Sequence, residues 1–255
     1  MKGYVTPESK YILEKDITCY EVDGEQRLKP SAFMDIAQEM AYLAAEAMHF
    51  GYDELRTEGK AWVLSRLRFV FGEVPKWRDH VEVATWHKGP YGPFYLRDFT
   101  ISSPSGERKV CGTSSWVILD VESRRMCRTA EVVEMIPEST VCHDAAIEAP
   151  APKVQMPRTA EPVPVGSHMV AYSDVDILGH TNNARYVVWG LDCIDYEVTS
   201  GRTLKELSIN FNHETKQGQK VDLYLFREDG ENGETAFYVE GKVDGAQAFC
   251  MKADY

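Results

Sequence analysis

Residues 172–191 read YSDVDILGHTNNARYVVWGL, which sets a polar, glycine-containing loop directly before an amphipathic helix. The apolar side chains after the loop recur at helical spacing; they are Ala184, Val187, Val188, Leu191 and Ile194. Asn182 or Asn183 can cap the first turn, where unpaired backbone N–H groups and the helix dipole favour an anion. The sequence therefore predicts that this loop ends at a helix N-terminus and that the helix runs to about residue 197.

The loop carries groups that acyl transfer or hydrolysis requires. Asp176 is a candidate general base or nucleophile, and His180 follows at a spacing that lets the two act together if the loop curls into the helix. Gly179 relaxes the steric limits on the backbone, so we expect its amide to face a substrate carbonyl. The plainer interpretation is that Asp and Asn before a helix serve only as caps and turns. The full string Asp-x-Asp-x-x-Gly-His-x-Asn-Asn is more specific than any single member.

The length of 255 residues and the composition, 44% hydrophobic and 27% charged, are those of an ordinary globular protein. This length can hold one large domain or two small ones. No apolar run approaches the roughly 20 residues that cross a bilayer, and the N-terminus lacks the hydrophobic core of a signal peptide, so we expect a cytoplasmic protein. Forty acidic against 28 basic residues give a net charge of -12, which argues against nucleic acid and anionic membranes as partners.

The cysteines and histidines show no metal-ligand spacing. The six cysteines contain no CxxC pair, and we expect them to be reduced; they are Cys19, Cys111, Cys127, Cys142, Cys193 and Cys250. His213 adjoins Glu214, but no compact His/Asp ligand motif surrounds them. The sequence therefore predicts neither a metal nor a cofactor.

The first part of the chain predicts a strand, a helix and four further strands. Residues 9–23 have strand character, and a long helix begins at Pro30 or Ser31. The apolar stripe of this helix is Phe33, Ile36, Ala37, Met40, Ala44, Ala47 and Met48. The further strands are expected at residues 61–71, 80–88, 94–103 and 109–120. One helix among several strands is an α+β arrangement.

The same order of elements returns after a proline-rich linker. A strand is expected at residues 167–173, then the loop and its helix, then strands near 204–214, 220–227, 234–243 and 247–253. The chain therefore reads as an internal duplication, in which residues 17–20 overlay residues 169–172. Continued without gaps, this overlay sets Gly24 opposite Asp176, and Arg27 and Leu28 opposite Gly179 and His180. On this overlay the first half lacks the polar string.

The loop string resembles the signature of hotdog-fold thioesterases and, in its details, that of the plant and bacterial acyl-ACP thioesterase family. Segments that resemble the family in the same order are residues 77–86, 97–99, 115–120 and 123–126. The resemblance covers most of residues 10–250. It implies an α+β tandem hotdog, each half a long helix wrapped by an antiparallel sheet. Residues 1–144 would bind the acyl chain, 145–165 would be the linker, and 166–255 would carry the catalytic loop.

The resemblance also assigns site residues. It implies catalytic roles for Asp176, His180 and Glu214, and oxyanion or loop roles for Gly179, Asn182 and Asn183. The family's Asn falls at Leu178, which cannot form a side-chain hydrogen bond. If the loop is extended, Leu178 points to the same side as Asp176, toward the substrate. The cysteine that follows the Glu in many members is Thr215 here, which excludes a thiolate at that position.

The implied reaction is hydrolysis of fatty acyl-acyl carrier protein (acyl-ACP) to free fatty acid and holo-ACP. Two alternatives stay open: an acyl-CoA thioesterase, and a non-catalytic acyl-binding hotdog protein. Arg124, Arg125 and Arg128 form the densest basic cluster and could meet carrier acids or coenzyme A phosphates, although a solvated face is the plainer interpretation. A homodimer is also left open.

Overall fold

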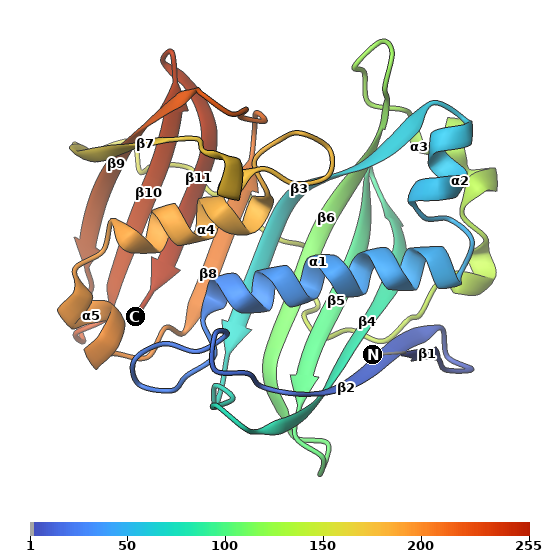
Figure 1. Cartoon of the computed structure of the whole chain (residues 1–255), viewed down its shortest axis with the longest axis horizontal. Coiled ribbons are helices and arrows are strands. Elements are labelled where there is room, and N and C mark those ends of the chain that lie inside the picture. Colours follow the sequence, from blue (N-terminus) through green and yellow to red (C-terminus); the bar gives the residue numbers. More distant parts are fainter. Residues whose placement is uncertain (1–2) are drawn as a thin grey trace.

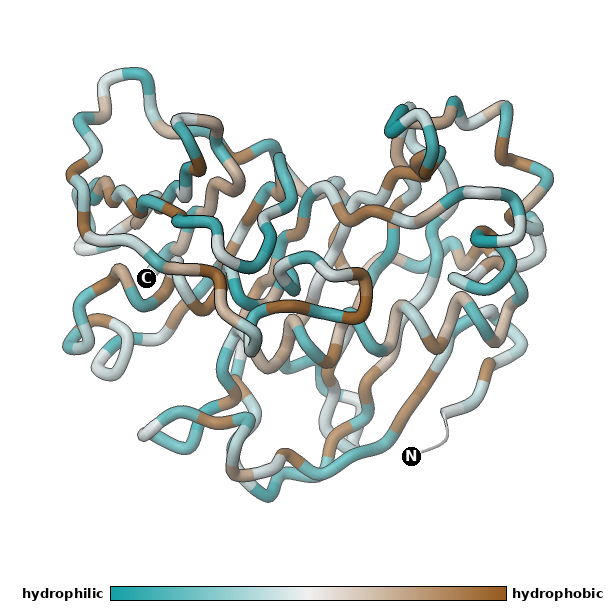
Figure 2. Tube along the Cα trace, turned by 45° about the horizontal axis from the view of Figure 1, so that its top comes forward, coloured by the Kyte–Doolittle hydropathy of each residue, from teal (hydrophilic) through white to brown (hydrophobic). Residues whose placement is uncertain are grey.

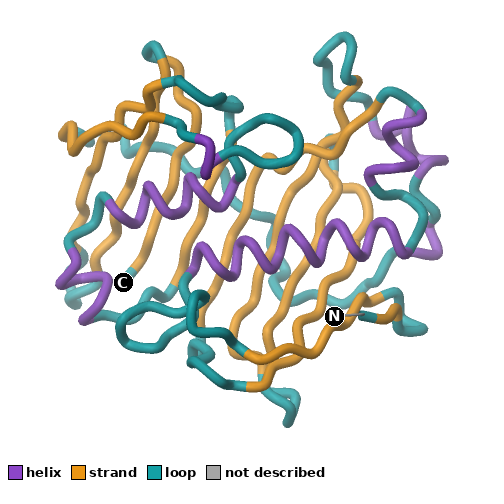
Figure 3. The backbone as a smooth tube through the Cα atoms, viewed as in Figure 1, coloured by secondary structure: helices purple, strands orange, loops and turns teal. Residues whose placement is uncertain are grey.

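The computed structural model describes residues 3–255, in which two main helices lie on one face of a single eleven-stranded sheet (Figures 1 and 3). The strands are β1 (Tyr4–Val5), β2 (Lys10–Asp16), β3 (Lys60–Phe71), β4 (His80–Tyr91), β5 (Phe94–Ser102), β6 (Arg108–Asp120), β7 (Val163–Met169), β8 (Glu206–Phe211), β9 (Lys220–Asp229), β10 (Thr235–Val243) and β11 (Ala246–Asp254). The helices are α1 (Pro30–Ala47), α2 (Tyr52–Thr57), α3 (Thr129–Val132), α4 (Asn183–Asp192) and α5 (Tyr196–Gly201), with 3-10 turns η1 (Val133–Met135), η2 (Glu138–Thr140) and η3 (Tyr172–Asp174).

The strand order shows the duplication directly. The sheet runs β1-β2-β4-β5-β6-β3-β8-β11-β10-β9-β7, so the order β2-β4-β5-β6-β3 of the first half is mirrored by β7-β9-β10-β11-β8 of the second. The halves join where β3 pairs antiparallel with β8, with Leu67 opposite Ile209. The predicted α+β tandem hotdog is thereby confirmed, and its two sheets form one continuous sheet.

Helix α1 forms where the apolar stripe predicted it. Pro30 stands in its first turn, where a missing N–H costs no hydrogen bond. Phe33 is fully buried, and its ring centroid lies 4.3 Å from that of Phe69 on β3. Gly112 on β6 allows this packing, because a Cβ there would lie 2.8 Å from the Phe69 ring. Ala47, expected in the stripe, is exposed, whereas Ala44 and Ala45 in the same turn are buried.

Helix α4 packs beside α1 and runs in the opposite direction (Figure 1). It ends at Asp192 rather than near residue 197, and the short helix α5 follows as a separate element. Ile194 lies in the bend between them and is buried there, so its apolar character reflects burial and not continued helix. Within residues 3–255, no helix is both long and apolar enough to cross a bilayer.

Two predicted strands have different ends. Strand β2 stops at Asp16, and residues 17–29 form a loop; strand β7 begins at Val163 and ends at Met169, so it starts inside the expected linker. Along β10, buried and half-buried residues alternate at first, as expected for a strand with one face on the core. Hydrophobic and hydrophilic residues are interspersed along much of the chain (Figure 2).

The linker is extended but packed. It passes behind the sheet, on the face away from α1 and α4 (Figure 3). Asn210 on β8 holds it by accepting the Val154 N–H at 3.1 Å and donating to the Val154 carbonyl at 2.6 Å. Asp98 on β5 accepts the Ala146 N–H at 2.8 Å. These bonds anchor the linker to both halves of the sheet.

Candidate active site

The loop before α4 is a hairpin turn that projects beside that helix (Figure 1). Val175 and Thr181 pair in an antiparallel bridge at its base. The Asp176 N–H donates to the His180 carbonyl at 2.9 Å, and the Gly179 N–H donates to the Asp176 carbonyl at 3.0 Å. Gly179 has a φ of 76°, a left-handed conformation that glycine adopts without steric cost. The loop therefore turns back on itself before the helix begins.

This turn corrects two expectations. The Gly179 N–H is already bonded inside the turn, and α4 begins only at Asn183, so the geometry does not offer that amide to a substrate carbonyl. The loop is also not extended, because the Asp176 carboxylate accepts the Leu178 N–H at 2.9 Å. The alternation argument for Leu178 therefore fails. Leu178 is nonetheless outside the core, with half of its surface exposed.

Asn182 caps α4 as predicted, and a glutamine from the other half supports it. The Asn182 side chain accepts the Ala184 N–H at 2.8 Å. Gln38 on α1 donates to the Asn182 side chain and accepts from the Asn183 side chain, both at 3.1 Å. Gln38 thus connects the two halves at the start of α4. Its sequence signal is a polar residue within the buried stripe of α1.

The first acid of the loop, Asp174, has a structural role. It is 6% exposed, and its carboxylate lies 2.8 Å from His168 Nε2 and accepts the Ala171 N–H at 2.8 Å. Its carbonyl accepts the Asn182 N–H at 2.8 Å. His168 in turn stacks on Trp189 of α4, with ring centroids 4.4 Å apart. Asp174 therefore fixes the base of the loop and leaves Asp176 in the turn.

The structure brings His180 and Glu214 together. His180 Nε2 lies 3.2 Å from Glu214 Oε1, although the two residues are far apart in sequence. Arg124 Nη2 lies 2.8 Å from the same oxygen, and Lys216 Nζ lies 3.6 Å from it. Within the described chain, no hydrogen bond or ion pair joins the Asp176 carboxylate to His180 or Glu214.

The charges around Glu214 control its ionisation. Partial burial raises the pKa of this carboxyl. The hydrogen bond from Arg124 and the nearby basic groups His180, Arg124 and Lys216 lower the pKa by a larger amount, so it lies below its usual value. Glu214 is therefore the ionised partner of His180 at neutral pH. A carboxylate beside an imidazole can orient the ring for hydrogen bonding to a substrate or water.

A buried hydroxyl network fixes the two segments that carry this pair. Thr181 Oγ1 lies 2.6 Å from Thr215 Oγ1, and the Thr181 N–H donates to the Thr215 carbonyl at 2.8 Å. The Tyr186 hydroxyl lies 2.9 Å from Thr215 Oγ1 and accepts the Thr215 N–H at 3.0 Å. Burial raises the pKa of Tyr186, which keeps it protonated. Because Thr181 follows His180 and Thr215 follows Glu214, the network sets their separation.

The first half contains a loop with the same backbone hydrogen bonds. The Asp23 N–H donates to the Arg27 carbonyl at 2.8 Å, as the Asp176 N–H does to that of His180. The Gln26 N–H donates to the Asp23 carbonyl at 3.0 Å, as in the turn of the second half. Asp23 is therefore the counterpart of Asp176, and Arg27 is the counterpart of His180.

The overlay that starts with Ile17 opposite Met169 is thus one residue out of register. Ile17 and Val170 are the equivalent residues, since each donates its N–H at 2.9 Å to the carbonyl just before the neighbouring strand. Gly24 consequently does not stand opposite Asp176. The first half keeps the aspartate of the loop and lacks its histidine.

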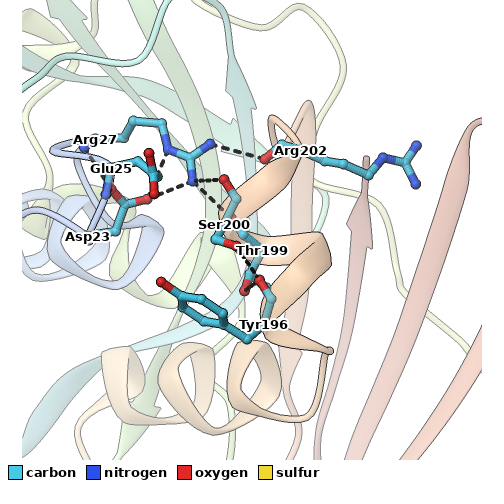
Figure 4. Close-up of polar contacts among 7 residues, drawn as sticks. All are labelled: Asp23, Glu25, Arg27, Tyr196, Thr199, Ser200 and Arg202. Carbon is cyan, nitrogen blue, oxygen red and sulfur yellow. Dashed lines mark hydrogen bonds and ion pairs between the residues drawn. The ribbon is translucent and has the colours of Figure 1, made fainter.

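A cavity of about 710 Å³ opens beside the counterpart loop, between it and α5. Arg27 closes one side: its Nε donates to Asp23 Oδ2 at 2.9 Å, and its Nη atoms donate at 3.0 to 3.2 Å to the carbonyls of Thr199, Ser200 and Arg202 (Figure 4). These donors are occupied, and no histidine lines the cavity. The side-chain chemistry of His180 and Glu214, and not this cavity, therefore identifies the candidate active site.

Comparison with known proteins shows which family the chain belongs to. The acyl-ACP thioesterase N-terminal domain matches residues 8–136, and the acyl-ACP thioesterase C-terminal domain matches residues 163–254. The chain is 24% identical to oleoyl-acyl carrier protein thioesterase 1, chloroplastic, of Arabidopsis thaliana, over 95% of this chain and 72% of that one. It is 27% identical to the chloroplastic palmitoyl-acyl carrier protein thioesterase of Gossypium hirsutum, over 78% of this chain but only half of that relative.

Solved structures show the same fold. An acyl-ACP thioesterase from Bacteroides thetaiotaomicron superposes with a TM-score of 0.76 at 22% identity, covering 96% of this chain and 97% of that one. The 12:0-ACP thioesterase from Umbellularia californica superposes with a TM-score of 0.80 at 18% identity, covering 96% and 93%. With both family domains matched in order along most of its length, the chain belongs to the acyl-ACP thioesterase family.

Proposed function

We propose that this protein hydrolyses the thioester of fatty acyl-ACP to free fatty acid and holo-ACP, which would end or divert fatty acid synthesis. The observation that carries the proposal is the His180–Glu214 pair, 3.2 Å apart, beside the turn that presents Asp176. Family membership supplies the reaction class. The pair and the turn belong to the second half, and Gln38 of the first half supports them by bonding to Asn182 and Asn183 at the start of α4.

Each residue has a distinct proposed role. As a general base, Asp176 removes a proton from water, whose oxygen attacks the thioester carbonyl; as a nucleophile, Asp176 attacks the carbonyl itself, and water then hydrolyses the acyl-aspartyl anhydride. In both routes the bond between carbon and sulfur breaks, and the carrier thiolate leaves and takes up a proton. His180 donates to or accepts from the water or thioester, and Glu214 orients its ring. Leu178, in the same turn, adds no hydrogen bond and is proposed to border the approach to the carbonyl.

The test measures release of the carrier thiol from acyl-ACP by the purified chain. The same acyl group on coenzyme A is measured for comparison. Hydrolysis of acyl-ACP at a higher kcat/KM than acyl-CoA is expected. Equal or better turnover of acyl-CoA would instead assign an acyl-CoA thioesterase. Stoichiometric acyl binding without hydrolysis of short, medium or long chains would assign the non-catalytic alternative.

Two further proposals concern the surface that binds the carrier protein and the formation of a homodimer. Arg124 is engaged with Glu214, so the proposed carrier-docking cluster reduces to Arg125 and Arg128, whose side chains are exposed. The proposed homodimer is checked by light scattering of the purified chain, where a mass of one chain would contradict it.

A further inference from the structure

Arg124 lies in a tight turn after β6, in the half of the chain that lacks the catalytic loop. The Arg124 N–H donates to the Asp120 carbonyl at 3.0 Å, and the Asp120 N–H donates to the Arg125 carbonyl at 2.9 Å. The Asp120 carboxylate also accepts the Ser123 N–H at 2.8 Å. Arg124 has a φ of 58°, which is uncommon for a residue with a side chain. The turn therefore holds this side chain in a defined direction.

The Arg124 side chain, from the first half, reaches Glu214 of the candidate site in the second half. Arg124 Nη2 lies 2.8 Å from Glu214 Oε1, the same oxygen that faces His180 Nε2. The Arg124 side chain is 61% exposed, and exposed ion pairs contribute little to folding stability. A contact of this kind is therefore better explained by an effect on the carboxylate than by an effect on the fold.

We propose that Arg124 is a positioning residue for hydrolysis: it holds the Glu214 carboxylate in the orientation that faces His180, so that the first half completes the site carried by the second. The inference rests on the proposed function, because positioning matters only if the pair acts on a thioester. Arg124 reaches the reaction through Glu214 and His180. Lys216, the other cation at this oxygen, is farther away at 3.6 Å and is 58% exposed.

The proposal predicts a direction for the pH dependence. The groups that face Glu214 are His180, Arg124 and Lys216, and the Tyr186 hydroxyl bonds to Thr215, the next residue. Burial raises the pKa of Glu214, and the three basic groups lower it below its usual value. Removing Arg124 removes the hydrogen bond that lowers this pKa, so the pKa rises. If the ionised carboxylate is required, the acid limb of the activity profile moves to higher pH.

A competing explanation is that Arg124 docks the acidic carrier, as its basic neighbours suggest. The two explanations differ in substrate dependence, because a carrier contact matters only for acyl-ACP, whereas a positioning contact matters for every thioester. Arg125 is a matched control, since it is adjacent, exposed and outside the ion pairs formed by Glu214 in the described chain.

The experiment compares Arg124→Gln, Arg124→Lys and Arg125→Gln with the unmodified chain, using one acyl group on ACP and on coenzyme A. Arg124→Gln is expected to lower kcat/KM about tenfold on both substrates, the effect of losing one charge-assisted hydrogen bond. Its acid limb should move to higher pH, and Arg124→Lys should recover part of both effects. Arg125→Gln should leave the acid limb in place on both substrates, because Arg125 forms no ion pair with Glu214.

A loss confined to acyl-ACP with an unmoved pH profile would overturn the proposal in favour of carrier docking. Unchanged kinetics on both substrates would show an inert surface pair. A second measurement needs no substrate: carbon-13 NMR titration of Glu214 should give a higher pKa in Arg124→Gln, and an unchanged pKa contradicts the inference. Failure of the unmodified chain to hydrolyse any thioester would instead overturn the proposed function and leave the titration as the test of the contact.

Discussion

The turn at Asp176 and its counterpart at Asp23 have the same backbone and different chemistry. Each turn starts with an aspartate that accepts one backbone N–H at its carbonyl and one, at 2.9 Å, at its carboxylate. The Asp23 carboxylate also accepts the Arg27 N–H at 2.8 Å. The position of His180 is taken by Arg27, and that of Leu178 by Glu25. The conformation of the loop therefore does not determine whether it is a catalytic site.

The residue opposite the histidine also differs. The Thr181 N–H donates to the Thr215 carbonyl, and the Leu28 N–H donates to the Pro75 carbonyl, both at 2.8 Å, so Val74 occupies the place of Glu214. The first half thus lacks both members of the titratable pair. Its Arg27 is instead committed to Asp23 and to the carbonyls at the end of α5 (Figure 4). One loop carries the groups that we propose for catalysis, and the other binds a helix end.

Converting the second loop into the first gives the largest expected effect. His180→Arg should lower kcat/KM on acyl-ACP by about 10²-fold or more, because arginine cannot exchange a proton at neutral pH. The thermal midpoint should change little, since Arg27 shows that the same backbone accepts arginine. Steady-state kinetics and thermal unfolding measure the two effects. Activity within tenfold of the unmodified chain would mean that the loops differ for another reason.

The pKa of Glu214 gives a second test, because the first half has no ionisable group at this position. Its pKa is lowered chiefly by Arg124, His180 and Lys216 against the effect of burial. The His180 contact is therefore expected to persist above this lowered pKa and to be lost as the pH falls through it. Lys216→Gln should raise the pKa and move the acid limb of kcat/KM to higher pH. A limb that does not move in this variant would show that Glu214 ionisation does not limit the rate.

Arg27 should affect stability where His180 affects rate. Arg27→Ala leaves the Thr199, Ser200 and Arg202 carbonyls without these donors, so we expect the free energy of unfolding to fall by about 2 kcal/mol. Turnover per folded molecule should be unchanged. Denaturant titration combined with kinetics tests both statements, and a loss of turnover without a loss of stability would reverse the assigned roles.

The smallest effect is expected at Leu178. Half of its surface is exposed, so an amide there stays solvated and costs little to introduce. Leu178→Asn restores the residue that the family resemblance places at this position and should raise kcat/KM or leave it within about threefold. Steady-state kinetics measure this. A fall of more than tenfold in a folded variant would show that the apolar side chain itself serves the reaction.

The sequence predicted the fold because its signals are local and repeated. The stripe of α1 has helical spacing, and the order of strands returns after the linker. The ends of elements were less predictable, as at Ile194, because an apolar residue is buried equally well in a helix or in a bend. The one-residue error at Ile17 arose because the overlay without gaps rested on weak residue similarity, whereas the structural match rests on backbone hydrogen bonds.

The candidate site was predictable only along one segment. Asp176 and His180 lie in one string, and Glu214 was assigned by resemblance. Gln38 and Arg124 approach from the first half, and nothing local in sequence marks contacts over such separations. The buried bonds of Thr181, Thr215 and Tyr186 join residues far apart in sequence, so no local pattern predicts them.

We propose that only the second of the two aspartate turns is catalytic. The most direct measurement is kcat/KM on acyl-ACP for Asp176→Asn and Asp23→Asn, which make the same chemical change in the same backbone turn. We predict a loss of about 10²- to 10⁴-fold for Asp176→Asn and a change of less than about threefold for Asp23→Asn, with both variants folded. Near-normal turnover by Asp176→Asn, or equal losses in the two variants, would contradict the account.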